Sequence, residues 1–335
     1  MYSTCSVEPF ISNENQLPGN RNPLLLLNNL SKSYKRSRVL NNISFSVNQG
    51  DVIGIIGPNG AGKTTTIKIL VGLLRDFDGQ VMIDGCPIPA HIDDVSHMIG
   101  YLPQKVSFQR WRTVDQALST FGRLSGLDDR ILDRRIIHVL KLVGLLEVRH
   151  KKIVQLSGGM VQRLGLAQAI LHDPRLVILD EPLAGLDPEN RFKVKKIIRD
   201  LGRSGKTVLF SSHILSDVED IVSNIVIIHN GKVLHSGTID SLRDNFISTK
   251  DIVIELNQAF NNLTDLGKIE GVNSAEQIQP NKILIHLKSE AEINVASRDI
   301  QRYFFEHGHV IRAFTPVARD LEEIFLLCTN GGGGQ

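Results

Sequence analysis

The stretch that most constrains this chain is an apolar run, Val52–Ile56, that leads through a glycine-rich loop into a segment with helical character from Lys63. The loop reads Gly-Pro-Asn-Gly-Ala-Gly-Lys-Thr over residues 57–64 and matches the pattern G-x-x-x-x-G-K-[ST]. Glycines let backbone N–H groups converge on one point, and the positive end of the following helix lies behind them. The sequence therefore predicts a strand, a phosphate-binding loop and a helix that runs to about Leu74.

Two side chains of this loop have defined roles in binding a nucleotide. Lys63 places a positive charge on the β and γ phosphates, and the Thr64 hydroxyl can bind the Mg²⁺ that bridges them. The residues expected to hold the phosphates are Gly57, Pro58, Asn59, Gly60, Ala61, Gly62, Lys63, Thr64 and Thr65. A glycine-rich turn that only caps a helix is the alternative, and the apolar strand in front of the loop argues against it.

Length and composition set broader limits. A chain of 335 residues with 41% hydrophobic and 22% charged residues can form one large domain with an appendage, or two domains. The net charge is only +2, so a nucleic acid or an anionic membrane would need a local basic patch to bind. Cys5, Cys86 and Cys328 lie far apart and form neither a metal-binding pattern nor a disulfide framework, which favours a reducing compartment.

Apolar runs in this sequence have the length of strands. The densest, residues 24–27 and 225–228, are far shorter than the roughly 18 residues of a membrane-spanning helix, so we expect no membrane span. Residues 1–22 lack the apolar core of a signal peptide and the arginines of a transit peptide. We expect them to form a disordered extension.

Alternating apolar and polar residues on both sides of a basic turn predict an antiparallel strand pair at 24–34 and 39–47. Tyr34, at the end of the first strand, could stack on a purine base, although an aromatic residue in a strand is commonly core or surface filling. Further on, Pro103 ends the strand Ile99–Leu102 and leaves Gln104 at the start of a loop. Helical spacing over residues 113–154 then indicates a helical insertion in an α/β chain.

A second glycine-containing element begins a helix at residues 156–159, which read Leu-Ser-Gly-Gly. Ser157 can cap this helix, and Gly158 and Gly159 leave bare N–H groups at its positive end, which suits an anion. A plain helix cap remains the alternative for this element.

Polar residues end two of the buried strands. Leu176–Leu179 is followed by Asp180 and Glu181, and Thr207–Ser212 by His213. Parallel strands of α/β sheets deliver functional groups at their carboxyl ends. Asp180 could hold Mg²⁺ directly or through water, and Glu181 could orient or deprotonate an attacking water. An isolated His in this position is more often structural than catalytic, and a third polar group at the same edge narrows the gap between these two interpretations.

The ordered set of these elements resembles the nucleotide-binding subunit of an ABC transporter over roughly residues 24–237. The resemblance implies an α/β fold, a P-loop NTPase domain of the ABC ATPase type with an antiparallel β subdomain, a RecA-like core and a helical subdomain. It also implies that Tyr34 stacks on the adenine of ATP, that Gln104 reaches Mg²⁺ and senses a membrane partner, and that His213 contacts the γ phosphate.

The same resemblance implies an assembly of two copies. Ser157, Gly158 and Gly159 would bind the γ phosphate of the ATP held by a second copy, with Asp187 at the contact between copies. The copies would pair head to tail with ATP between them. Met160 stands where many relatives have Gln, a departure that leaves the binding by Ser157 and the backbone intact.

The last hundred residues predict a small α+β appendage with strands at 252–256, 282–287 and 310–314 and helices at 293–305 and 321–327. Its ending resembles the accessory tail of ATPases that serve drug, antibiotic, polysaccharide and lipid exporters. The predicted domains are a disordered extension at 1–22, the ATPase domain at 23–240 with its helical insertion at about 108–160, the accessory domain at 241–328 and a flexible glycine-rich tail at 329–335.

The resulting hypothesis is an ATPase subunit that powers export through a separate transmembrane permease, on the cytoplasmic face of the membrane. An alternative is a soluble ATP-driven switch on ribosomes or DNA. Such relatives usually carry two ATPase domains or a coiled-coil insertion, and the small net charge offers no nucleic-acid surface, so no nucleic acid is expected. A scaffold that has lost hydrolysis is disfavoured because Glu181 and His213 are both present.

Overall fold

The computed structural model describes residues 23–35, 37–222, 224–246, 251–288 and 291–317. Contacts divide the chain into two compact units, Met1–Ile239 and Asp240–Gln335, which are described separately below. The predicted N-terminal extension, the helix expected at 321–327 and the glycine-rich tail lie outside the described residues.

The first unit contains an antiparallel sheet with the strand order β2-β1-β4-β5. The strands are β1 (Leu25–Tyr34), β2 (Ser37–Val47), β4 (Asp78–Ile83) and β5 (Cys86–Ile88). Leu25, Leu27 and Leu30 of β1 are buried, and β1 pairs with both β2 and β4. The structure has the antiparallel pair predicted from the alternating residues, because its apolar face packs into the core of this unit.

A six-stranded sheet forms the centre of the first unit, in the order β10-β9-β3-β8-β7-β6. The strands are β3 (Val52–Ile56), β6 (Ile99–Leu102), β7 (Leu176–Leu179), β8 (Thr207–Ser212), β9 (Asn224–His229) and β10 (Lys232–Thr238). All neighbours pair in parallel except β9 and β10, which form a hairpin. Strands β7 and β8 are buried along their whole length, as both faces of a parallel sheet are covered. The ends of β3, β7 and β8 therefore meet at one edge.

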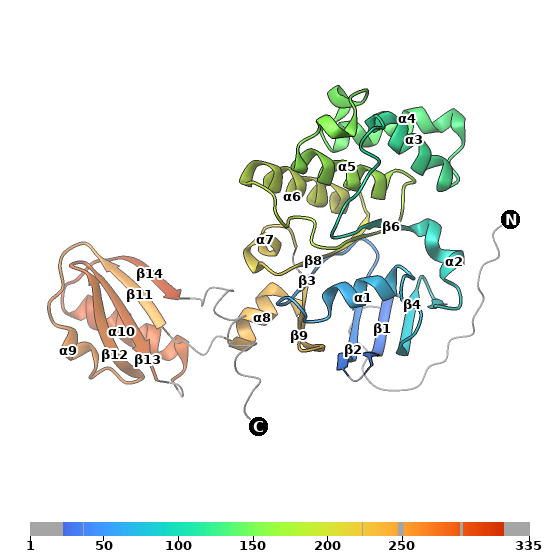
Figure 1. The fold of residues 1–335 in the computed structure, drawn as a ribbon. Helices are drawn as coiled ribbons and strands as arrows, with labels where there is room; N and C mark the ends of the chain where they lie inside the picture. Colours follow the sequence, from blue (N-terminus) through green and yellow to red (C-terminus); the bar gives the residue numbers. More distant parts are fainter. Residues whose placement is uncertain (1–22, 36, 223, 247–250, 289–290, 318–335) are drawn as a thin grey trace. The chain divides into compact units, whose positions relative to one another are not determined.

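Helices cover this sheet and extend from it (Figure 1). They are α1 (Lys63–Leu70), α2 (Ile92–Val95), α3 (Val114–Leu124), α4 (Asp129–Leu142), α5 (Gly158–Ile170), α6 (Pro188–Arg203) and α7 (Leu215–Glu219). Helix α8 (Ile239–Phe246) begins at the last residue of the first unit and continues into the second. Helices α3, α4 and α5 gather into a helical part between β6 and β7 in the sequence (Figure 1). Helix α1 ends four residues before Leu74, and Gly72 just beyond it has φ +76, which a helix does not continue through.

The second unit is a four-stranded antiparallel sheet with a helix on its apolar face. Its elements are β11 (Asp251–Leu256), α9 (Leu263–Leu266), β12 (Val272–Gln279), β13 (Lys282–Leu287), α10 (Ile293–Glu306) and β14 (Ile311–Val317), with the strand order β12-β13-β11-β14. Ile254, Ile285, Ile300 and Phe304 are fully buried between sheet and helix. The fold is thus α/β with an α+β appendage, as the sequence predicts.

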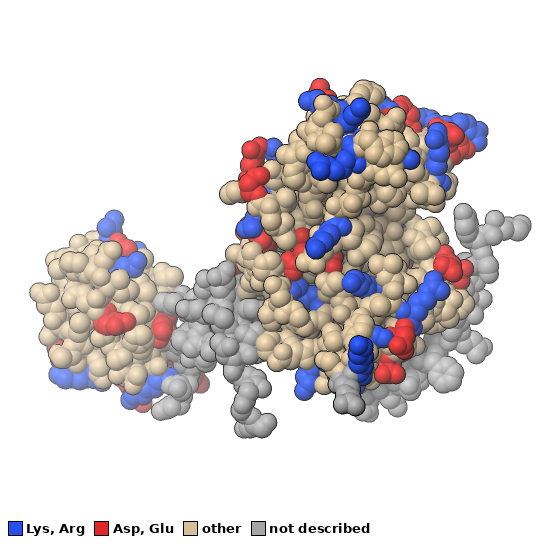
Figure 2. Space-filling model, viewed as in Figure 1, with Lys and Arg blue, Asp and Glu red and all other residues tan. Residues whose placement is uncertain are grey.

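One face of the first unit carries charges of both signs. Positive and negative side chains are interspersed on the face of the first unit in Figure 2, in keeping with the small net charge. Among the described residues, no helix combines the length and apolar character that a bilayer span requires.

Candidate active site

The phosphate loop joins β3 to α1 at the sheet edge where β8 also ends. The backbone N–H of Gly57 donates a hydrogen bond to the carbonyl of Ser212, at 3.3 Å. A Cβ atom at Gly57 would lie 2.2 Å from the carbonyl oxygen of Ile228, and Gly62, with φ +111, would place one 2.5 Å from Leu40. Both positions therefore require glycine, because any side chain would displace the loop from this edge.

Lys63 is the buried cation of the site. Its Nζ atom donates hydrogen bonds to the carbonyls of Gly57 (2.7 Å) and Pro58 (3.2 Å), and lies 3.3 Å from Oε1 of Glu181. The side chains of Lys63 and Glu181 are each only 5% exposed. The loop therefore holds its positive charge in a fixed, largely dry position, where an ionic interaction is stronger than in water.

Asp180 follows β7, and one of its carboxylate oxygens accepts hydrogen bonds from two hydroxyl groups. Oδ1 accepts hydrogen bonds from Thr64 Oγ1 (3.2 Å) and Ser211 Oγ (2.7 Å). Oδ2 is buried and has no hydrogen-bond partner among the described residues. A buried, unpartnered carboxylate oxygen beside a threonine hydroxyl offers the hard oxygen ligands that Mg²⁺ prefers, so the residues present fit this ion.

Glu181 is held by its backbone and by its side chain. Its φ angle is +50, uncommon for a residue other than glycine, and its N–H donates to Ser211 Oγ at 2.8 Å. Oε2 lies 2.8 Å from Nδ1 of His213, which follows the neighbouring strand β8. The carboxylate is thereby fixed between the imidazole of His213 and the ammonium of Lys63.

The charge on Asp180 affects a tyrosine of the adjacent strand. Burial, the larger cause, and the negative charge of Asp180 together raise the pKa of Tyr101, on β6, to about 12. The hydroxyl of Tyr101 therefore stays protonated at neutral pH and adds no negative charge beside Asp180.

A second group of predicted residues lies where α5 and α6 begin. Ser157 Oγ accepts a hydrogen bond from the N–H of Met160 (3.3 Å) and caps α5. Asp187 caps α6, accepting from the N–H (2.9 Å) and side-chain amide (2.7 Å) of Asn190; these bonds lower the pKa of Asp187. A Cβ atom at Gly159 would lie 2.4 Å from Asn190, so the absence of a side chain there lets the two helix starts approach each other.

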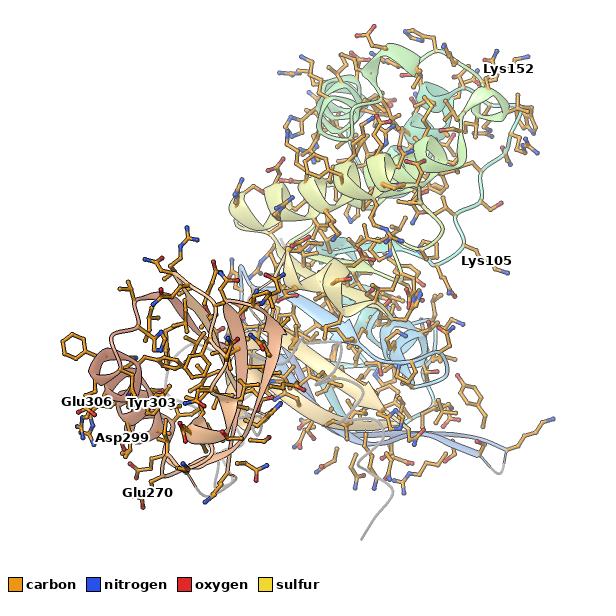
Figure 3. All side chains as sticks on the ribbon, turned by 90° about the vertical axis from the view of Figure 1, so that its left-hand side faces the viewer. Lys105, Lys152, Glu270, Asp299, Tyr303 and Glu306 are labelled. Atoms are coloured by element: carbon orange, nitrogen blue, oxygen red, sulfur yellow. The ribbon has the colours of Figure 1, made fainter. Side chains whose placement is uncertain are left out.

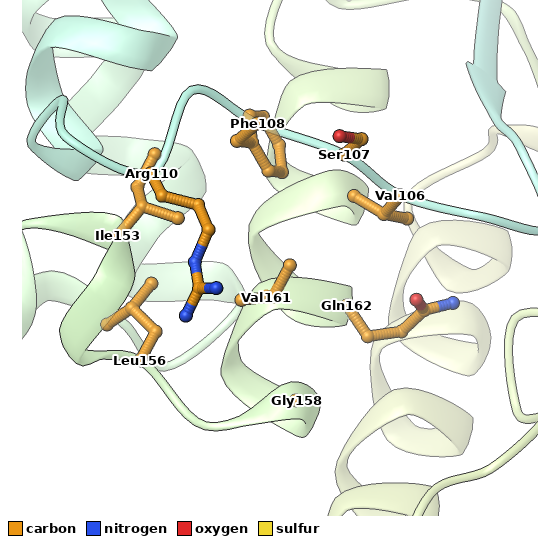
Figure 4. Close-up of a pocket in the computed structure, with 9 residues that line it drawn as sticks. All are labelled: Val106, Ser107, Phe108, Arg110, Ile153, Leu156, Gly158, Val161 and Gln162. Carbon is orange, nitrogen blue, oxygen red and sulfur yellow. The ribbon is translucent and has the colours of Figure 1, made fainter.

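One hydrogen bond connects the two groups. The side-chain amide of Gln162, on α5, donates to the carbonyl of Pro182 at 3.1 Å, and Pro182 directly follows Glu181. A cavity of about 450 Å³ lies beside this connection, between α5 and the loop that follows β6 (Figure 4). Arg110 and Gly158 both line it (Figure 4).

The structure brings some predicted residues together and leaves others apart. The loop from Gly57 to Thr64 contacts Asp180 and Glu181, and Glu181 contacts His213. Tyr34 lies at the end of β1, 43% exposed, with Lys32 Nζ 5.2 Å from its ring centre, and Gln104 is exposed just after β6. Within the described part of the chain, no hydrogen bond joins either side chain to the phosphate loop.

Sequence reasoning missed Ser211 and Gln162. Ser211 connects Asp180 to the backbone of Glu181, and Gln162 connects α5 to the same segment. The available signal was the Ser-Ser pair that ends the apolar strand β8, directly before His213.

The fold and the site together define a P-loop nucleotide-binding domain. Residues 40–184 match the family described as ABC transporter. The uncharacterised ABC transporter ATP-binding protein YdbJ of Bacillus subtilis (strain 168) is 33% identical over 311 residues, covering 92% of this chain and 96% of that protein. The Nod factor export ATP-binding protein I of Cupriavidus pinatubonensis is 33% identical over 248 residues, covering 73% of this chain and 76% of that protein.

A solved structure gives the same result. It is described as the ATP-binding subunit of an ABC transporter, is 31% identical, and covers 67% of this chain and 93% of its own with a TM-score of 0.61. The chain belongs to the family of ABC transporter ATP-binding subunits.

Proposed function

We propose that this chain is the ATP-hydrolysing subunit of an ABC exporter and that Glu181 is its general base. The observation that supports this most directly is the placement of the Glu181 carboxylate, 2.8 Å from His213 and 3.3 Å from Lys63, next to the pair formed by Thr64 and Asp180. A carboxylate beside a phosphate loop is placed to take a proton from a water that attacks the terminal phosphate.

Each neighbouring residue has a separate role in this proposal. Lys63 binds the β and γ phosphates of ATP, and Thr64 and Asp180 would hold Mg²⁺, with Gln104 as a further ligand. When bound, Mg²⁺ neutralises the charge that develops on the phosphate oxygens. His213 orients Glu181 and contacts the γ phosphate.

The proposal includes a second copy of the chain. Ser157, Gly158 and Gly159 would bind the γ phosphate of the ATP held by the other copy, with Asp187 at the contact. Tyr34 would stack on the adenine. The exposure of Asp187 and Tyr34 supports these roles, since a group that meets a partner or a base must be reachable in the single chain.

Coupling to transport is the last part of the proposal. One relative is named a Nod factor export ATP-binding protein, which favours export as the direction. A separate permease would carry the cargo, and this chain would bind that permease at the cytoplasmic face of the membrane. Co-purification of a permease with the tagged chain from detergent extracts tests this part, and recovery of the chain with ribosomes instead would contradict it.

A hydrolysis-deficient variant tests the nucleotide mechanism. Glu181→Gln should bind ATP, lose turnover by at least about 100-fold and form a stable dimer with MgATP, because the base is removed while the phosphate ligands remain. Phosphate release and light scattering measure these properties. Wild-type hydrolysis by this variant, or a monomer at saturating MgATP, would refute the proposed mechanism.

A further inference from the structure

Two short segments run side by side where the helical part of the first unit begins. The N–H of Val154 donates to the carbonyl of Arg110 (3.0 Å), and the N–H of Ile153 donates to the carbonyl of Arg112 (2.9 Å). Thr113 and Lys152 form an antiparallel bridge next to these bonds. We call six side chains of the two segments the Arg–Trp edge; they are Arg110, Trp111, Arg112, Lys151, Lys152 and Val154.

The Arg–Trp edge exposes apolar side chains as well as charges. Trp111 is 66% exposed and Val154 is 49% exposed. The guanidinium of Arg112 lies 5.1 Å from the centre of the Trp111 ring and donates a hydrogen bond to Thr120. Arg112 thus holds a large aromatic side chain at the surface of the protein. Exposure of this apolar area to water is unfavourable, and contact with a binding partner would remove that cost.

The cations of the edge are not neutralised within the protein. Among the described residues, none of Arg110, Arg112, Lys151 and Lys152 forms an ion pair. The nearby carboxylates of Asp115 and Asp133 both contact Arg149 instead. A protein with a net charge of only +2 therefore carries a local basic surface, which is the condition that its composition sets for binding an anionic membrane.

Arg110 and Arg112 border the neighbouring cavities, whereas the other side chains of the edge do not. Cavities of about 450 and 270 Å³ border Phe108, and neither is lined by Trp111 or Lys152. Figure 3 shows Lys152 and Lys105 extending away from the ribbon on the same side of the first unit. Trp111 and Lys152 are therefore free to meet a partner outside the cavities, and a fluid lipid surface needs no pocket to be bound.

We propose that the Arg–Trp edge binds the headgroup region of an anionic lipid bilayer directly. Lysine and arginine are attracted to the negative potential of such a surface, and tryptophan concentrates at the level of the headgroups. Arg110, Lys151 and Lys152 contact lipid phosphates, and Trp111 and Val154 lie between the headgroups. This contact goes beyond the nucleotide function and requires neither ATP nor a permease.

Trp111 provides the measurement because it is the only tryptophan of the chain. The full chain is mixed, without nucleotide, with vesicles of phosphatidylcholine containing phosphatidylglycerol, or with vesicles of phosphatidylcholine alone. We expect a blue shift of the Trp111 emission and sedimentation with the anionic vesicles only, both weakened by added salt because mobile ions screen the attraction.

Charge variants test whether vesicle binding depends on this edge or only on the net charge of the protein. Each cation near an anionic surface contributes about fivefold in affinity, so Arg110→Gln/Lys151→Gln/Lys152→Gln should bind on the order of 100-fold more weakly. The matched control, Arg134→Gln/Lys141→Gln/Lys196→Gln, removes the same charge from exposed positions outside the edge and should bind like the wild type.

Several results would overturn the proposal. They are an unchanged Trp111 emission with anionic vesicles, equal binding to neutral vesicles, or an equal loss in the control variant. A response to an acidic peptide such as polyglutamate without one to vesicles would assign the edge to an acidic protein instead. No nucleotide is present in these experiments. A negative result would therefore overturn lipid binding without bearing on the proposed ATP hydrolysis.

Discussion

The ammonium of Lys63 lies 3.3 Å from a carboxylate oxygen of Glu181, and both side chains are almost completely buried. The residue expected to bind phosphate therefore contacts the residue expected to activate water. Removal of one partner from a buried pair is costly, because the other charge remains without compensation. The positions of the Lys63 ammonium and the Glu181 carboxylate therefore depend on each other even without a bound nucleotide.

Lys63→Ala should weaken ATP binding by about 10- to 100-fold, since a hydrogen bond to a charged group is worth about 1.5–3 kcal/mol. The nucleotide-free variant should also unfold at a lower temperature, because Glu181 loses its cation. Calorimetric titration and thermal unfolding measure the two effects. Lys68→Ala, at an exposed position of the same helix, is the control. Normal ATP binding by the Lys63 variant would argue against the phosphate loop.

Ser211→Ala should destabilise the protein by about 1–3 kcal/mol, because the buried N–H of Glu181 loses its acceptor. The same change removes the donor to Asp180 Oδ1, so the Mg²⁺ dependence of ATP hydrolysis should change as well. Urea unfolding and a magnesium titration of the ATPase rate provide the measurements. Wild-type values in both would show that Ser211 does not position the two carboxylates.

A pair of glycine variants tests how closely α5 approaches α6. Gly159→Ala places a Cβ atom 2.4 Å from Asn190 and should cost about 1 kcal/mol, because Asn190 must release one of its hydrogen bonds to Asp187. Gly158→Ala is the matched control, with nothing within 4 Å, and should leave the melting temperature unchanged or raised. Equal melting temperatures for the two variants would contradict the close approach.

His172 should make stability depend on pH. Burial lowers its pKa below the ordinary value of 6.5, and its Nε2 lies 3.0 Å from the carbonyl of Ile99. Below pH 6.5 the unfolded chain takes up a proton that the folded chain does not, so the free energy of unfolding falls as the pH decreases through the lowered pKa.

His172→Gln tests that sign. The variant should be destabilised most above pH 6.5, and its difference from the wild type should shrink as the pH falls. Chemical unfolding of both proteins over this pH range provides the measurement. A difference that grows toward acidic pH would show that the folded protein holds His172 protonated.

Much of the fold could be predicted because the central strands are uniformly apolar. Strands β7 and β8 are buried along their whole length, and their sequences show it. Strand β12 could not be predicted, because Val272–Gln279 is mostly exposed and polar and is specified by pairing with β13. The end of α1 was placed too late, since the apolar residues that follow pack as a turn rather than a helix.

In the candidate site, too, some features follow from local sequence patterns and others depend on contacts between residues far apart in the sequence. The positions of Asp180, Glu181 and His213 follow from strands that end at one edge of a parallel sheet. The contact of Lys63 with Glu181 joins residues 118 positions apart, and the bridge through Ser211 depends on the register of two strands. No local sequence pattern contains that information.

The left-handed backbone conformation of Glu181 is unfavourable for most residue types. At φ +50 a glycine or an asparagine would relax more easily than a glutamate, and a β-branched residue would fit worst of all. If folding stability alone determined this position, glycine or asparagine would be favoured over glutamate. The chain thus holds a locally strained conformation at the carboxylate that we propose as the general base.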